Sequence, residues 1–291
     1  QYFEMFGNRG LYYKGWSAVT KHRTPWEMVG GTLPAFDDDV WELYDGSSDF
    51  SQAHDLSAED PARLAQLQRL WLIEATKYNV LPIDDRGIER ATPEIAGRPT
   101  LIRGTSQVLY AGMGRLSENS VVSIKNKSFS VTAEIDVPDG GADGVIIAQG
   151  GRFGGWSLYL KDGAAVFVYN VLGIHEFATT AGSPVPAGRH QVRMEFAYDG
   201  GGLGKGGDVT LYYDGTAAGT GRVGATQAMV FSADETTDVG FESGTAVASG
   251  YTAQTSRFTG KIEWVQIDIG DDDHDHLIDP AERLRIIMAR Q

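Results

Sequence analysis

The sequence contains no cysteine, few basic residues and no long apolar run. Without cysteine the chain has no disulfide, no thiolate nucleophile and no zinc–cysteine site. Lys and Arg number 25 against 39 Asp and Glu, so the formal net charge is −14, and the basic face of a nucleic-acid binder is missing. No stretch reaches the roughly 18 apolar residues of a membrane-spanning helix, and no signal peptide is visible. We therefore expect no nucleic-acid and no membrane partner, and the sequence does not indicate a compartment.

The residues that are abundant indicate a globular protein with many tight turns. Hydrophobic residues make up 42% of the 291 positions, charged residues 22%, and glycine occurs 37 times. This length favours two domains. Because the chain starts without Met inside a strand-like run, we expect it to be a piece of a longer protein. The predicted organisation is an α+β subdomain over residues 1–80, a linker over 81–100, a β-sandwich over 101–270, and a loop with a helix over 271–291.

The predicted β-sandwich is centred on residues 143–170. Three short runs rich in Val, Ile, Tyr, Phe and Trp are separated there by a glycine-rich break at 150–155 and by Asp162-Gly163, a strong hairpin signal. Further strand patterns follow at intervals of about ten residues up to Ile269. Many antiparallel strands at this spacing predict a jelly-roll or concanavalin-like sandwich, so the fold class is mainly β with some α.

The first eighty residues follow a different pattern. Short alternating runs at Gln1–Gly7, Gly10–Val19 and Trp41–Tyr44 predict a small antiparallel sheet. A helix is predicted over Pro61–Tyr78, where apolar residues recur at helical spacing and proline occupies the first turn. Because one helix covers one face of such a sheet, the other face needs a larger neighbour.

This N-terminal region resembles the C-terminal subdomain of type I sulfatases, the arylsulfatase family. Several separated motifs occur in the family's order and together cover roughly residues 1–90. They are Tyr2-Phe3-Glu4-Met5-Phe6-Gly7-Asn8-Arg9-Gly10, Trp16, His22-Arg23-Thr24-Pro25-Trp26, Trp41-Glu42-Leu43-Tyr44-Asp45, His54-Asp55-Leu56, and the helix end Lys77-Tyr78-Asn79-Val80-Leu81-Pro82.

The resemblance implies a sulfuric ester hydrolase that uses formylglycine and calcium. In that family the formylglycine arises from Cys or Ser in a Cys/Ser-x-Pro-x-Arg motif, and the metal offsets sulfate charge. This chain has no such motif, so we expect no catalytic residue in it and no activity of the chain alone. Its main partner would be a missing N-terminal sulfatase domain; a homo-oligomer and a sulfated small molecule or glycan are further expected partners.

Two sets of residues are candidate sites. His22 and Arg23 suit the substrate pocket of a complete sulfatase, because donors beside a sulfate ester are chemically sensible. The alternative is structural, with Arg23 paired to Glu27 and His22 capping a loop. Asp271, Asp273, Asp275, Asp279 and Glu282 fall at positions 1, 3, 5, 9 and 12 of a calcium loop, although His276 replaces the usual glycine. The alternative here is a helix start, with Asp279 as N-cap and Glu282 completing a capping box.

Two other functions compete with the sulfatase interpretation: a lectin-like glycan-binding module and a structural or oligomerisation domain. For the lectin, the candidate residues near the central strands are Phe153, Trp156, Tyr159, Asn170 and His175. Because Trp156 and Tyr159 are three positions apart in a strand, they point to opposite faces, and at least one belongs to the core.

Overall fold

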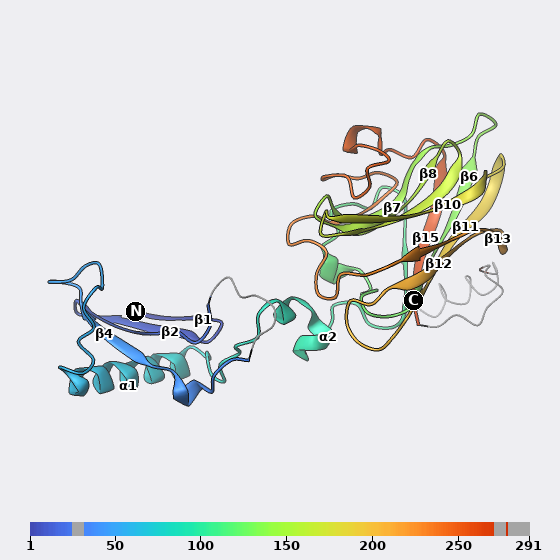
Figure 1. Ribbon diagram of the computed structural model, residues 1–291. Coiled ribbons are helices and arrows are strands. Elements are labelled where there is room, and N and C mark those ends of the chain that lie inside the picture. Colours follow the sequence, from blue (N-terminus) through green and yellow to red (C-terminus); the bar gives the residue numbers. More distant parts are fainter. Residues whose placement is uncertain (25–31, 271–277, 279–291) are drawn as a thin grey trace. The chain divides into compact units, whose positions relative to one another are not determined.

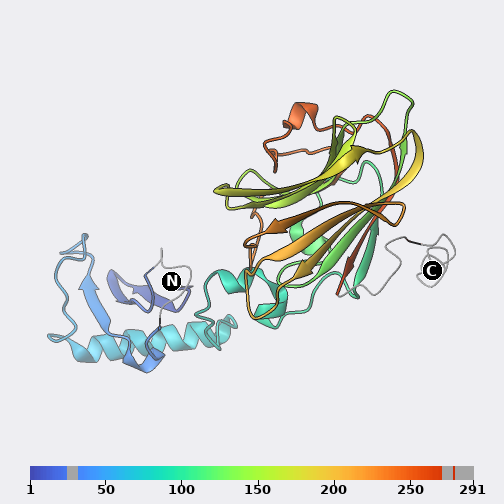
Figure 2. The ribbon, with the colours of Figure 1, turned by 45° about the vertical axis from the view of Figure 1, so that its right-hand side comes forward.

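The computed structural model describes residues 1–24, 32–270 and 278, and the chain divides into two units, 1–96 and 97–291. The first unit contains a four-stranded antiparallel sheet and one long helix (Figure 1). The second contains two antiparallel sheets packed as a sandwich (Figures 1 and 2). This architecture confirms the predicted mainly β fold class.

The N-terminal sheet has the order β1-β2-β3-β4. Its strands are β1 (Tyr2–Met5), β2 (Asn8–Tyr13), β3 (Trp16–Thr20) and β4 (Trp41–Asp45). The three alternating runs predict three or four strands, and the structure has four because the run 10–19 contains a tight turn between β2 and β3. Lys14 and Gly15 form that turn with φ angles of 49° and 88°, a conformation that hairpins of this kind require.

Helix α1 (Pro61–Lys77) covers one face of this sheet, as predicted. The Asp60 carboxylate accepts the Arg63 N–H at 3.0 Å and so caps the helix start. Leu67, Trp71 and Ala75 of the helix pack on the sheet residues Leu11, Ala18 and Leu43 in one buried cluster. The Trp71 indole also donates to the Phe3 carbonyl at 3.0 Å, which ties the helix to strand β1.

The predicted extended linker contains short helical turns. The 3₁₀ turn η2 (Ile88–Ala91) is followed there by helix α2 (Pro93–Ala96), whereas the 3₁₀ turn η1 (Phe36–Asp38) lies earlier, between β3 and β4. Proline at the first helical position starts a helix readily, because its missing N–H would have no helical acceptor there. Pro93 therefore starts a helical turn, and the stretch is not extended throughout.

The sandwich consists of a five-stranded sheet, order β10-β9-β8-β7-β14, and a six-stranded sheet, order β13-β12-β11-β6-β15-β5. The strands are β5 (Ser106–Leu109), β6 (Phe129–Val137), β7 (Gly144–Gly151), β8 (Gly154–Lys161), β9 (Ala164–Val171), β10 (His175–Pro184), β11 (Gly188–Tyr198), β12 (Gly207–Tyr213), β13 (Thr216–Val223), β14 (Thr237–Val239) and β15 (Lys261–Ile269), with 3₁₀ turns η3 (Glu118–Ser120) and η4 (Ala253–Thr255). The central hairpins β7–β8–β9 are those predicted from the sequence. Strands β5 and β13 were missed; β13 reads Thr-Ala-Ala-Gly-Thr-Gly-Arg-Val, with one large apolar residue.

The main core lies between the two sheets. Phe129 packs its ring 6.1 Å from that of Trp156 and 5.4 Å from that of Phe196, so both sheets contribute to one aromatic centre. The indole of Trp156 donates to Gln149 Oε1 at 2.9 Å, which satisfies its buried N–H. A second, smaller cluster covers the outer face of the five-stranded sheet. There Val247, Ala248 and Tyr251 of the loop after β14 pack on Tyr159 and its neighbours.

Candidate functional site

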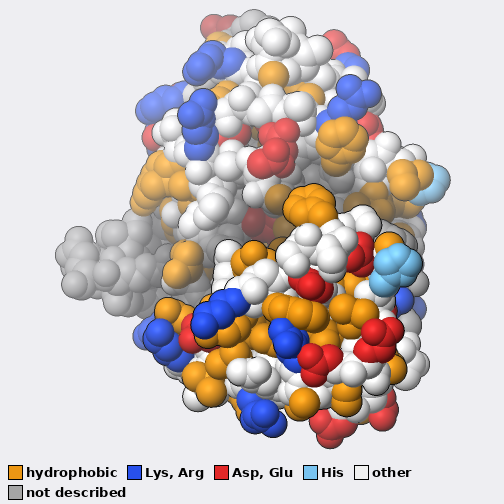
Figure 3. All heavy atoms as spheres, turned by 90° about the vertical axis from the view of Figure 1, so that its left-hand side faces the viewer, with side chains coloured by type: hydrophobic (Ala, Val, Ile, Leu, Met, Phe, Trp, Pro, Cys, Tyr) orange, Lys and Arg blue, Asp and Glu red, His pale blue; other side chains and the backbone are white. Residues whose placement is uncertain are grey.

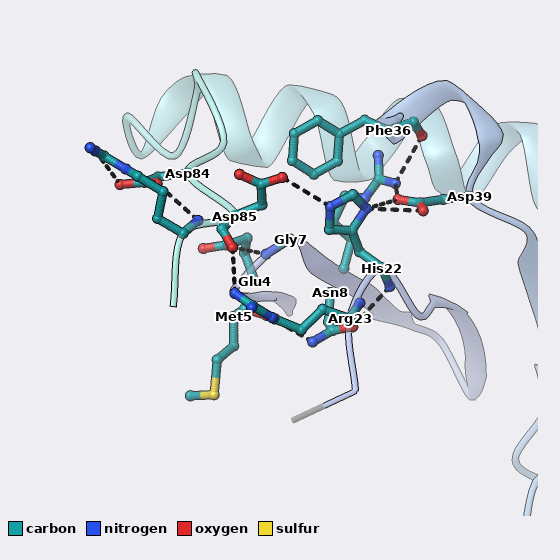
Figure 4. A network of polar contacts seen from close by, with 12 residues as sticks. Glu4, Met5, Gly7, Asn8, His22, Arg23, Phe36, Asp39, Asp84 and Asp85 are labelled. Atoms are coloured by element: carbon teal, nitrogen blue, oxygen red, sulfur yellow. Dashed lines mark hydrogen bonds and ion pairs between the residues drawn. The ribbon is translucent and has the colours of Figure 1, made fainter. Parts of the chain in front are cut away.

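The predicted residues His22 and Arg23 lie in a buried polar cluster of the N-terminal unit (Figure 4). His22 Nδ1 is 2.9 Å from Asp39 Oδ2, and Nε2 is 3.2 Å from Asp85 Oδ2. Both ring nitrogens therefore face carboxylate oxygens, and only the imidazolium form can donate to both. The ring stacks on Phe36 with centroids 4.3 Å apart and leaves no part of the side chain exposed.

Glycine at position 7 makes room for this histidine. A Cβ at Gly7 would lie 2.4 Å from His22 Cδ2, and the φ of Gly7 is +86°. The Asn8 side chain accepts the backbone N–H groups of His22 and Arg23 at 2.9 and 3.1 Å. The β1–β2 turn thus fixes the segment that carries both predicted residues.

The cluster contains three further charged side chains, those of Arg9, Arg86 and Asp84. Arg9 pairs with Asp39, and Arg23 Nη1 donates to the Asp85 carbonyl at 2.8 Å. Next to it Arg86 binds Asp84 through two nitrogens, and these hydrogen bonds hold the pKa of Asp84 below its ordinary value. The cluster therefore joins the segment around residues 84–86 to the sheet through charge-assisted contacts.

Arg23 and His22 differ in their position relative to a surface groove. Arg23 lines an open groove of about 990 Å³ together with Phe3, Met5 and Lys21, whereas His22 does not border it. The Nε of Arg23 has no hydrogen-bond partner among the described residues, although the side chain is 5% exposed. Arg23 therefore combines a place in the groove lining with a buried Nε donor that no described residue accepts. The alternative pairing of Arg23 with Glu27 lies outside the described residues.

The face of the N-terminal sheet opposite helix α1 is not covered by described residues. Side chains alternate along β1 and β2, so Tyr2 and Leu11 point to the helix while Phe3, Met5 and Tyr12 point away from it. Their exposed fractions are 51%, 64% and 51%. The surface of this unit shows apolar side chains among charges of both signs (Figure 3). A cluster of this kind is typical of an interaction surface.

The predicted calcium ligands, Asp271, Asp273, Asp275, Asp279 and Glu282, lie outside the described residues. Position 8 of that loop, Ile278, is described: its backbone N–H and C=O pair with the Gln191 side-chain amide at 2.9 and 2.8 Å. Within residues 1–24, 32–270 and 278, no group of three or more His, Asp or Glu is arranged to hold a metal. In the same ranges, no helix is long and apolar enough to cross a membrane.

Of the five residues that are candidates for glycan binding, three are buried and two are exposed. Trp156 lies in the core between the sheets and Tyr159 in the cluster on the outer face, so the prediction that they point to opposite faces is confirmed. Asn170 is also buried, and its amide serves the backbone of neighbouring loops. Only Phe153 and His175 are exposed. Three of the five side chains therefore have structural roles.

A buried carboxyl group, Glu242, was not anticipated from the sequence. It lies in the loop that covers the five-stranded sheet, where its Oε1 accepts the Val247 N–H at 3.0 Å. Burial raises the pKa of Glu242 to about 7; contacts with Tyr251 and Val247 oppose the rise, and the charges of Asp238 and Glu235 add to it. A lone Glu in a glycine- and serine-rich loop gives no sequence signal for burial.

No family model matches this chain, and no curated protein is similar to it. Solved structures are similar at low identity. The sialidase CBM40 of Ruminococcus gnavus, bound to α2,3-sialyllactose, is 11% identical over 63% of this chain and 98% of its own, with a TM-score of 0.40. Domains LG4-5 of the mouse laminin α1 chain are 16% identical over 58% of this chain and 40% of theirs (TM-score 0.35). A pentraxin from Limulus polyphemus is 14% identical over 60% and 78% (TM-score 0.32).

The second unit is a β-sandwich, because its two antiparallel sheets share one core.

Proposed function

We propose that this chain is the C-terminal part of an arylsulfatase-like sulfuric ester hydrolase, and that its N-terminal unit completes the fold of an upstream α/β catalytic domain. The observation that supports this most is the uncovered face of the N-terminal sheet. Phe3, Met5 and Tyr12 lie there in water beside the groove, while the opposite face is fully used by helix α1. The sulfatase-like motifs of residues 1–90 occur in the order of that family and indicate that a sulfatase catalytic domain would cover this face.

The chemistry of the reaction belongs to the missing domain. Formylglycine would supply the nucleophile and calcium would offset the charge of the sulfate group. The chain lacks the Cys/Ser-x-Pro-x-Arg motif, and the described residues hold no metal-binding group, so neither component fits here. The contribution of this chain is to close the substrate pocket: Arg23 would present a donor to an anionic group, and His22 would hold the segment that carries it.

The test is association in trans with the polypeptide encoded upstream. The wild-type chain is expected to bind it, and Phe3→Ser with Met5→Ser is expected to weaken binding at least tenfold. Phe50→Ser is the matched control, since Phe50 is 95% exposed in the same unit but lies in a loop. Turnover of 4-methylumbelliferyl sulfate by this chain alone, or an upstream sequence without Cys/Ser-x-Pro-x-Arg, would contradict the proposal.

We propose a second function for the sandwich, the binding of glycans as a lectin-like module. It is favoured by the phenyl ring of Phe153, which lies on a hairpin turn and is 73% exposed. The test is retardation of the chain during native electrophoresis in gels that contain a polysaccharide. Migration that no polysaccharide changes would leave the sandwich as a structural or oligomerisation domain.

A further inference from the structure

One hairpin turn of the sandwich departs from its sister turns. Three hairpins share the same turn conformation, with positive φ at both central residues. In two of them the first residue is aspartate: Asp162 with φ 52° and Asp214 with φ 49°, each followed by glycine. In the β9–β10 turn that position is Leu172, with φ 55°.

Leucine at this position is unfavourable for two reasons. A left-handed conformation costs a residue other than Gly, Asn or Asp on the order of 1 kcal/mol. The side chain also gains no burial in return, because Leu172 is 57% exposed and the following Ile174 is 70% exposed. The turn needs the left-handed conformation but does not need leucine, so contact with a ligand would account for an apolar side chain at this exposed position.

The adjacent β7–β8 turn places an aromatic ring beside the β9–β10 turn. A Cβ at Gly173 would lie 3.6 Å from Phe153 Cδ1, so the phenyl ring lies against the glycine between Leu172 and Ile174. We call Phe153, Leu172 and Ile174 the hairpin platform. Two turns that are about twenty residues apart in sequence thus lie next to each other and carry three exposed apolar residues.

The buried side chain of Asn170 holds the platform in place. Its Nδ2 donates to the carbonyls of Arg152 and Val247 at 3.0 and 2.8 Å, and its Oδ1 accepts the Gly173 N–H at 2.9 Å. Arg152 N–H in turn donates to Thr245 Oγ1 at 2.9 Å. One amide therefore fixes both turns and the loop behind them, and a ligand site built on such support loses little conformational entropy on binding.

The size and charge of the platform indicate what it binds. Three side chains offer far less than the roughly 800 Å² that each partner buries in a stable protein interface. A formal net charge of −14, with Glu176 and Glu235 near the platform, disfavours an anionic membrane. An exposed phenyl ring in turns that also carry the exposed polar residues Arg152 and His175 suits a pyranose ring, which has an apolar face and a polar rim.

We propose that the hairpin platform is a glycan-binding site that stacks a pyranose ring on Phe153. This inference rests on the proposed glycan-binding function of the sandwich and assigns its location. It also explains why leucine occupies position 172: the proposed contact with the sugar would offset the cost of its left-handed conformation.

The experiment measures retardation of the full chain in native gels that contain laminarin or xylan, as neutral glycans, or λ-carrageenan, as a sulfated one. We expect wild type to be retarded, and Phe153→Ala and Leu172→Asn to weaken binding at least tenfold. Leu101→Asn is the control, since Leu101 is 74% exposed and lies outside the platform. Leu172→Asn should also raise the melting temperature, because asparagine tolerates the left-handed conformation.

Each other outcome overturns a defined part of the proposal. Retardation that persists in Phe153→Ala and Leu172→Asn leaves the glycan function standing and refutes the site. No retardation of wild type in any of the three gels refutes both. Sedimentation with phosphatidylcholine vesicles that Phe153→Ala abolishes, without retardation in the gels, would show that the platform is a membrane contact. A lower melting temperature for Leu172→Asn would remove the strain on which the inference depends.

Discussion

Glu242 predicts an unusual dependence of the sandwich's stability on pH. Its carboxyl group is buried in the loop over the five-stranded sheet, in the field of Asp238 and Glu235, and its pKa in the folded protein is about 7 against an ordinary value of 4.5. The folded state therefore holds this proton more tightly than the unfolded state does. Protonation stabilises the fold, and ionisation opposes it.

The size of this change in the free energy of unfolding follows from the difference in proton binding between the folded and unfolded states. Below pH 4.5 both states are protonated and Glu242 carries no penalty. Between pH 4.5 and 7 only the unfolded state releases the proton, so the free energy of unfolding falls with rising pH and levels off above pH 7. A shift of 2.5 units, from 4.5 to about 7, corresponds to about 3 kcal/mol of stability lost by pH 8.

The perturbation is Glu242→Gln, which keeps the shape of the side chain and removes its titration. We expect the variant to unfold in urea with nearly the wild-type free energy at pH 4.5 and with about 3 kcal/mol more than wild type at pH 8. Asp139→Asn, at an exposed turn of the same unit, controls for the loss of one negative charge. Hydrogen exchange of the peptide that contains Glu242 assigns the effect to the loop. Parallel pH curves for wild type and Glu242→Gln would refute the reasoning.

One further variant in each unit tests how its residues pack. His22→Ala should destabilise the N-terminal unit by roughly 3 kcal/mol, because it removes a fully buried ring that stacks on Phe36 and contacts Asp39; the exposed His54→Ala should have no such effect in thermal unfolding. Gly144→Ala and Gly141→Ala both place a side chain at positive φ, but the new Cβ at 144 would lie 2.4 Å from the Arg257 carbonyl oxygen, while nothing lies within 4 Å at 141. The loss of stability in urea should therefore be larger at 144 by about 1–3 kcal/mol, and equal losses would contradict the close approach of β7 to the backbone of residue 257.

Strands and helices with a strong local signal were predictable. Helix α1 combines apolar residues at helical spacing with proline in its first turn, and the Asp162-Gly163 turn has the preferred residues for its conformation. Strand β13 was missed because Ala, Gly and Thr give no alternating apolar pattern. Its position is fixed by pairing with β12, an interaction between strands that the local pattern of β13 does not encode.

The candidate sites were less predictable than the fold, because the same polar atoms serve ligands and backbone alike. Asn170 has the donors and the acceptor that a sugar would require, yet the structure uses them on the backbone at 152, 173 and 247. His22 was recognised from its motif, but its partners Asp39 and Asp85 lie 17 and 63 residues away along the chain. No spacing rule connects these three positions.

The two units differ in how completely each buries its own apolar surface. In the sandwich, the inner faces of both sheets share one core, and the outer face of the five-stranded sheet is covered by the loop that carries Val247 and Tyr251. In the N-terminal unit one face of the sheet is used by α1, while Phe3, Met5 and Tyr12 stay exposed on the other. A small unit that leaves a sheet face open gives up hydrophobic stabilisation, at about 25 cal/mol per Å², that a partner would restore. The exposed apolar residues of the N-terminal sheet therefore lie where a partner domain would gain the most from binding, whereas the sandwich already buries the inner faces of both its sheets.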